Sequence, residues 1–128
     1  MPIYHKLVRD RIPDIIRASG KTCVCRILDE AEYLERLEDK LQEELTEYME
    51  SKSMEELADL LEVMSAVAKA RGSSLEEVDA LRRAKAAARG GFDGRVLLEE
   101  VSPGNAETIS THAPLARCDN LIAPPTQK

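Results

Sequence analysis

Two runs of apolar residues at helical spacing constrain what this chain can fold into more than any other feature. Apolar residues stand at positions 34, 37, 41, 45 and 48, and again at 54, 57, 61, 64 and 68. Steps of three and four residues gather side chains on one face of a helix. The polar break Ser51-Lys52-Ser53 separates the runs. We therefore predict two long helices, residues 30–50 and 54–71.

The ends of these helices, and two further helices, are signalled by capping residues. Asp29 followed by Glu32 has the spacing of a capping box at the start of the first long helix. Pro13 suits the first turn of a short helix that stops near Gly20. Another helix, residues 75–88, is expected between Gly72 and the break at Arg89-Gly90-Gly91-Phe92.

Two short segments outside the helices have a composition that favours strands. Residues 22–28 and 95–101 are short and contain β-branched residues, and they are expected to pair as a two-stranded element. The rest of the apolar content is Leu, Ala, Val, Ile and Met, with one Phe and no Trp, which favours helices. The predicted fold class is an all-α helical bundle that accommodates this short β element.

Length and composition predict one domain, residues 1–101, followed by a flexible tail, residues 102–128, with four prolines and no apolar period. The net charge of -6 argues against a nucleic-acid polymer as partner. Three cysteines cannot all pair within one chain, and the two histidines lack the spacing of a zinc site. No segment is long and apolar enough to span a membrane. We expect reduced thiols and a soluble, cytoplasmic protein.

Four acidic residues interrupt the apolar faces of the two long helices. Glu44 and Glu47 are three residues apart in the first helix, and Glu56 and Asp59 are three apart in the second. If the helices pack as an antiparallel hairpin, all four carboxylates come level beside the turn. Like charges that are partly buried together are costly unless a cation neutralises them. Their oxygen ligands suit Mg²⁺, or Mn²⁺ as a substitute.

Two other interpretations of these acids remain open on spacing alone. With 24 acidic residues in the chain, pairs three apart arise by chance on a solvated helix face. Ser53 and Glu56 also have the spacing of a capping box, which would turn the Glu56 carboxylate back toward the Ser53 amide and away from a metal.

Three separated motifs resemble a known superfamily. Glu43-Glu44-Leu45-Thr46-Glu47 and Glu56-Leu57-Ala58-Asp59 resemble the paired acidic signature of the MazG-like all-α nucleoside triphosphate pyrophosphatases. The segment Lys6-Leu7-Val8-Arg9-Asp10-Arg11-Ile12-Pro13 and the later Arg89-Gly90-Gly91-Phe92 look like its phosphoribosyl-ATP pyrophosphohydrolase-like branch. The resemblance covers residues 3 to 101.

The resemblance implies a Mg²⁺-dependent enzyme that cleaves a nucleoside triphosphate between the α and β phosphates, as in nucleotide-pool house-cleaning. It implies metal ligands at Glu44, Glu47, Glu56 and Asp59, with Glu47 or Glu44 accepting the proton of the attacking water. Two alternatives stay open. One is the hydrolysis of phosphoribosyl-ATP in histidine biosynthesis, and the other is a non-catalytic helical assembly module.

Basic residues in the motifs are candidates for phosphate contacts. Lys6 and Arg9 are three residues apart, and Lys85 and Arg89 are four apart, so each pair presents two cations on one side. Ion pairing with the abundant surface acids is the competing interpretation, and for Lys85 the two are evenly matched.

The second long helix carries two neighbouring apolar rows, at positions 57, 61 and 64 and at 60, 63 and 67. One partner helix cannot cover both. We therefore expect at least a homodimer, in which a two-fold partner covers the row of Leu60, Val63 and Val67.

Overall fold

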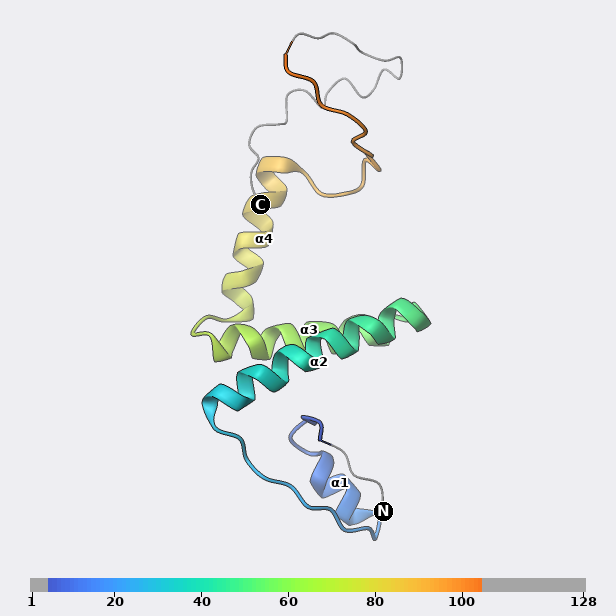
Figure 1. Cartoon of the computed structure of the whole chain (residues 1–128), viewed down its shortest axis with the longest axis vertical. Helices are drawn as coiled ribbons and strands as arrows, with labels where there is room; N and C mark the ends of the chain where they lie inside the picture. Colours follow the sequence, from blue (N-terminus) through green and yellow to red (C-terminus); the bar gives the residue numbers. More distant parts are fainter. Residues whose placement is uncertain (1–4, 105–128) are drawn as a thin grey trace. The chain divides into compact units, whose positions relative to one another are not determined.

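The computed structural model describes residues 5–104, and this part of the chain is all-helical. Four helices follow one another: α1 (Ile12–Ala18), α2 (Glu30–Ser51), α3 (Met54–Ala70) and α4 (Leu75–Arg89) (Figure 1). The predicted all-α class and all four predicted helices are confirmed, with ends that differ by a residue or two.

Side-chain caps and one left-handed residue set the limits of the two long helices. Asp29 Oδ1 accepts a hydrogen bond from the Glu32 amide at 2.9 Å and begins α2. Lys52 adopts a left-handed conformation, with φ 57°, and its amide donates to the Tyr48 carbonyl at 2.7 Å. Ser53 Oγ then accepts from the Glu56 amide and begins α3. A connection of only two residues makes α2 and α3 an antiparallel hairpin.

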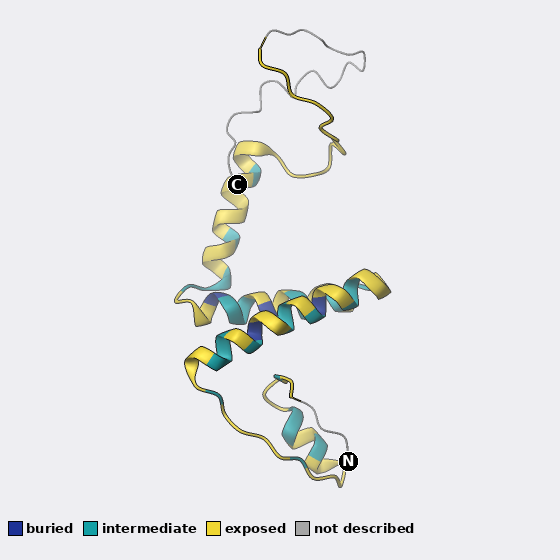
Figure 2. Cartoon of the chain, viewed as in Figure 1, coloured by how far each residue is buried: buried dark blue, intermediate teal, exposed yellow. Residues whose placement is uncertain are grey.

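The buried residues of the described chain lie in this hairpin, where α2 and α3 pack together (Figure 2). Leu37, Val63 and Ala68 are its buried apolar residues. Each is less than a tenth exposed, so a small core holds the two helices together.

The predicted orientation of the α3 rows is wrong. Val63 is buried in the hairpin, and Leu60 and Val67 are half-buried beside it. The other row is the open one: Leu57, Leu61 and Met64 are each at least 40% exposed. Both rows are apolar and both step by three and four residues, so spacing alone could not tell which of them faces α2.

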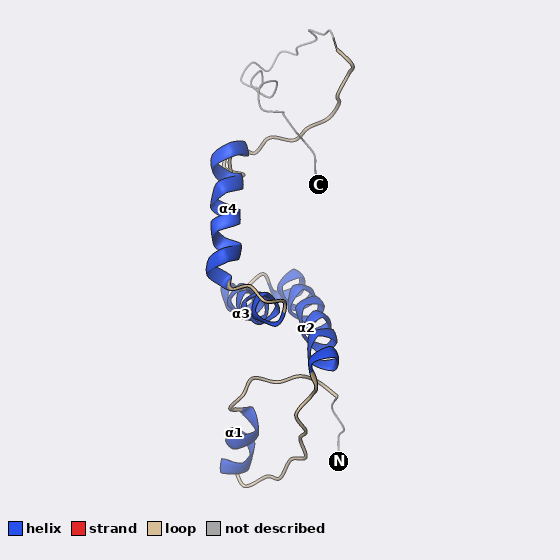
Figure 3. Ribbon diagram, turned by 90° about the vertical axis from the view of Figure 1, so that its left-hand side faces the viewer, coloured by secondary structure: helices blue, strands red, loops and turns tan. Residues whose placement is uncertain are grey.

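The predicted two-stranded element is wrong as well. Neither residues 22–28 nor residues 95–101 form a strand, and Figure 3 shows only helices and loops in the described chain. Val24 is fully exposed and Ile27 is 96% exposed. β-branched residues favour an extended backbone, but a strand also needs a hydrogen-bonded neighbour and an apolar face to bury.

The chain divides into two units, Met1–Val78 and Asp79–Lys128, and α4 crosses the division. The predicted boundary at residue 101 stays a prediction, because residues 105–128 of the expected tail lie outside the described residues. Within residues 5–104, no helix is both long enough and apolar enough to cross a membrane.

Candidate metal centre

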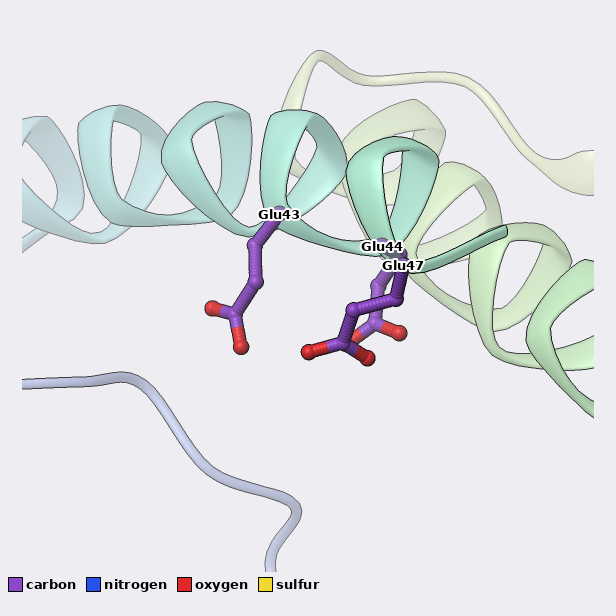
Figure 4. Close-up of side chains that lie close together, drawn as sticks. All are labelled: Glu43, Glu44 and Glu47. Atoms are coloured by element: carbon purple, nitrogen blue, oxygen red, sulfur yellow. The ribbon is translucent and has the colours of Figure 1, made fainter. Parts of the chain in front are cut away.

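The short connection between α2 and α3 brings the four predicted acids to one end of the hairpin. Glu44 and Glu47 lie in the last two turns of α2, and Glu56 and Asp59 lie in the first two turns of α3. Figure 4 shows Glu44 and Glu47, together with Glu43, projecting from the same side of α2. Helical spacing and an antiparallel return are therefore sufficient to gather these carboxylates.

Two overlapping groups of carboxylates lie close enough together to hold a cation. In the first, one oxygen each from Glu43, Glu44 and Glu47 lies within 4.8 Å of the others. In the second, the same limit holds for Glu44, Glu56 and Asp59. Glu44 belongs to both groups and is the centre of the cluster.

Glu44 is a buried acid among other charged side chains. The residue is only 6% exposed, more deeply buried than its apolar neighbour Leu45 at 42%. Among the described residues, no hydrogen-bond partner reaches its buried Oε1. Burial raises the pKa of Glu44, and the charge of Glu47 raises it further, while Lys40 opposes both. A buried carboxylate oxygen without a partner is costly, which indicates a role other than holding the fold.

Glu56 does not complete the capping box that its spacing allowed. The Ser53 amide donates instead to Ser51 Oγ at 3.1 Å. The Glu56 Oε1 is buried and has no hydrogen-bond partner in the described chain. Burial raises the pKa of Glu56, followed by the charges of Glu47 and Asp59, and a hydrogen bond that protonated Glu56 donates to Glu47 adds to the effect. The Glu56 carboxylate thus belongs to the acid cluster.

Two of the four predicted basic residues reach the cluster from the segment before α1. Arg9 Nη2 lies 2.8 Å from Asp59 Oδ1, and Lys6 Nζ lies 3.2 Å from Glu43 Oε2. Lys6 and Arg9 therefore form ion pairs, as the competing interpretation expected, but their partners are acids of the candidate site.

Lys40 is a site residue that the sequence analysis missed. Its Nζ lies 3.5 Å from Glu43 Oε1 and 3.6 Å from Glu44 Oε2, and its side chain is 22% exposed. The signal was present, since Lys40 stands three and four residues before these acids on one helix. At Glu43, burial acts to raise the pKa, but the hydrogen bond from Lys6 and the charge of Lys40 outweigh it and lower the pKa.

Lys85 and Arg89 are exposed on α4, in the second unit. Their role as phosphate contacts stays a prediction.

A shallow groove of about 270 Å³ also lies along the hairpin, lined by Glu38, Leu41, Gln42, Leu45, Leu60 and Met64. It contains none of the four predicted acids, so the acid cluster and the groove are separate features.

Comparison with known proteins gives one short match. A stretch of 42 residues is 57% identical to a protein of Mycolicibacterium smegmatis that bears the name uncharacterized protein. The stretch is 33% of this chain and 43% of the relative, so the chain spans less than half of the relative's length. No protein-family model matches the sequence, and no solved structure matches it.

Proposed function

We propose that this chain is a Mg²⁺-dependent nucleoside triphosphate pyrophosphohydrolase, similar to the MazG-like all-α superfamily that its motifs resemble. The observation that carries the proposal is the environment of Glu44. The residue is buried, and its Oε1 has no partner in the described chain. A carboxylate oxygen of Glu44 lies within 4.8 Å of carboxylate oxygens of Glu56 and Asp59. A cation is the simplest group that makes such an arrangement favourable.

The donor atoms fit a hard divalent cation. All are carboxylate oxygens, which Mg²⁺ and Mn²⁺ prefer over softer ligands. The two buried oxygens without partners, Glu44 Oε1 and Glu56 Oε1, come from different helices, so a cation between them would also tie α2 to α3. When bound, Mg²⁺ would neutralise charge on the phosphate oxygens and on the pyrophosphate leaving group.

The chain's own residues would do the remaining chemistry. Glu47 lies beside Glu44 and Glu56, which places a carboxylate next to the site to accept a proton from the attacking water. The water oxygen forms a bond to the α-phosphorus, the bond from the α-phosphorus to the bridging oxygen breaks, and its electron pair leaves with pyrophosphate. Lys6 and Arg9, already at the cluster, would bind the phosphate oxygens.

We further propose that the protein works as a homodimer or a higher homo-oligomer. Leu57, Leu61 and Met64 form an exposed apolar row along α3, and Leu45 on α2 is exposed as well. A second copy that packs on this row would remove these apolar side chains from water. Cys23 and Cys25 are free thiols, which suits the reducing cytoplasm.

A nucleotide panel tests the proposed activity. The full chain with Mg²⁺ is incubated with ribo- and deoxyribonucleoside triphosphates and phosphoribosyl-ATP, and monophosphate and pyrophosphate are measured together. We expect equal amounts of the two products from at least one substrate, and none in the presence of a chelator. Release of inorganic phosphate alone, or no hydrolysis of any substrate, would refute the proposal.

A further inference from the structure

The segment before α1 is tied to the acid cluster by ion pairs to both helices of the hairpin. Lys6 pairs with Glu43 of α2, and Arg9 pairs with Asp59 of α3, across 37 and 50 residues of sequence. Residues 5–9 adopt no regular secondary structure, and the backbone hydrogen bond at their end is a local one, from the Ile12 amide to the Arg9 carbonyl at 3.0 Å. The hydrogen bonds of this segment to the hairpin come from the Lys6 and Arg9 side chains.

The partner of Arg9 is also a candidate metal ligand. Asp59 Oδ1 accepts from Arg9 Nη2 at 2.8 Å, and Asp59 belongs to the acid group that includes Glu44 and Glu56. A divalent cation lies about 2 Å from a carboxylate oxygen that binds it. At this oxygen it would face the guanidinium charge at short range, which is unfavourable. Arg9 and the cation compete for Asp59.

The ion pair is of a kind that a divalent cation can displace. The Arg9 and Asp59 side chains are 60% and 40% exposed, and exposed pairs of one cation with one carboxylate contribute little to stability. The Lys6 and Glu43 side chains are 55% and 27% exposed. Glu44 supplies the reason for a cation to bind here, since its Oε1 is buried and unpartnered in the described chain.

We propose that residues 5–11 form a cation strap, in which Arg9 and Lys6 leave Asp59 and Glu43 when a divalent cation binds, and then bind the polyphosphate of the substrate. This inference rests on the proposed function for the identity of the anion. The strap couples the two ligands: the cation displaces Arg9 from its carboxylate, and the freed guanidinium favours a phosphate chain. The cation and the polyphosphate therefore bind cooperatively.

The first test measures Mn²⁺ binding to the full chain, with electron paramagnetic resonance reporting the concentration of the free ion. Replacing Arg9 with glutamine removes the competitor, so Arg9→Gln should bind Mn²⁺ about two- to fivefold more tightly than the unmodified protein. Lys6→Gln should act in the same direction and less. The matched control is Arg17→Gln, because Arg17 pairs with Asp14 on α1, away from the cluster, and should not alter Mn²⁺ affinity.

The second test is amide hydrogen exchange of residues 5–11, which we expect to speed up when Mn²⁺ binds the unmodified protein. Equal or weaker Mn²⁺ binding by Arg9→Gln, or slower exchange with Mn²⁺, would overturn the strap. The proposed function would survive that result if nucleotide hydrolysis persisted. Conversely, tighter Mn²⁺ binding without hydrolysis of any nucleotide would support the strap and refute the function. No Mn²⁺ binding by any variant would refute both.

Discussion

Acids in two regions of this chain have opposite environments. On α4, Asp79 accepts hydrogen bonds from Arg82 Nε at 2.7 Å and Arg83 Nε at 2.9 Å, and these bonds lower its pKa. In the α2–α3 hairpin, Glu44 and Glu56 each keep a buried oxygen without a partner in the described chain, and burial raises the pKa of both. Asp79 is an ordinary surface acid, and the hairpin acids are not.

The difference separates an acid that stabilises a helix from acids that we propose to bind a cation. An arginine one turn away satisfies Asp79 at no cost in burial. Glu44 instead occupies a buried position where an apolar residue would stabilise the hairpin more. The hairpin therefore retains an unfavourable charge at a buried position, which is expected of a binding site.

The largest contrast should appear in activity. Replacing Glu47 with glutamine, or Asp59 with asparagine, keeps the shape of the side chain and removes a charge from the site. We expect pyrophosphate release to fall at least about 1000-fold, since Asp59 would lose a charge that holds the cation and Glu47 would lose the ability to accept the proton of the attacking water. Asp79→Asn is the matched control and should retain full activity. Circular dichroism should show unchanged helix content in all three variants, and full-rate Glu47→Gln and Asp59→Asn proteins would refute the site.

The two apolar rows of α3 should respond differently to a new charge. Val63 is buried, so Val63→Asp places an unpaired carboxylate in the core and should destabilise the hairpin by about 3 kcal/mol. Leu61 is 48% exposed, so Leu61→Asp should leave the fold intact and release monomers from the proposed dimer. Chemical denaturation and light scattering measure these effects. An unmodified protein that is already an active monomer would rule out the dimer.

Removing the Glu44 charge should stabilise the protein when no metal is present. A carboxyl group whose pKa is raised by folding stabilises the fold at low pH and destabilises it as the pH rises above the ordinary value of 4.5. In chelator at pH 7.5, Glu44→Gln should therefore melt roughly 2–6 °C higher, the equivalent of about 1 kcal/mol. At pH 3.5 the gain should disappear. A Glu44→Gln protein that melts lower at pH 7.5 would show that this acid supports the fold.

The smallest effect is expected at the C-terminal end. A chain that ends at Val101 lacks the segment without apolar periodicity, and it should fold and hydrolyse nucleotides as the full chain does. The melting temperature and the rate of pyrophosphate release are measured for the truncated chain and the full chain. A lower melting temperature or a lower rate after truncation would mean that residues 102–128 belong to the functional unit.

Local signals explain how much of the fold could be predicted. Asp29 and Ser53 accept helix-starting hydrogen bonds, and Gly72 and Gly90 adopt left-handed conformations after α3 and α4, so capping chemistry located the helix ends. The prediction of two strands was wrong because strand pairing depends on a partner elsewhere in the chain. The prediction of which α3 row faces α2 was wrong because Val63 and Leu61 are both apolar in sequence and differ in what packs against them.

The part of the candidate site that helix geometry determines, which is the grouping of its acids, could be predicted from the sequence. A spacing of three residues and a two-residue turn were enough to gather Glu44, Glu56 and Asp59. Spacing could not show that the Ser53 amide bonds to Ser51, which leaves Glu56 in the cluster. Nor could it show which acids Arg9 and Lys6 contact, because those ion pairs cross 50 and 37 residues of sequence.

The most direct measurement is the position of a bound cation in the hairpin. Crystals of the full chain soaked in Mn²⁺ and measured at the manganese absorption edge would show the ion as an anomalous difference peak. We predict a peak about 2 Å from carboxylate oxygens of Glu44, Glu56 and Asp59. A fully occupied peak elsewhere, or no peak in crystals where the acid cluster is open to solvent, would contradict the assignment of these acids as a metal centre.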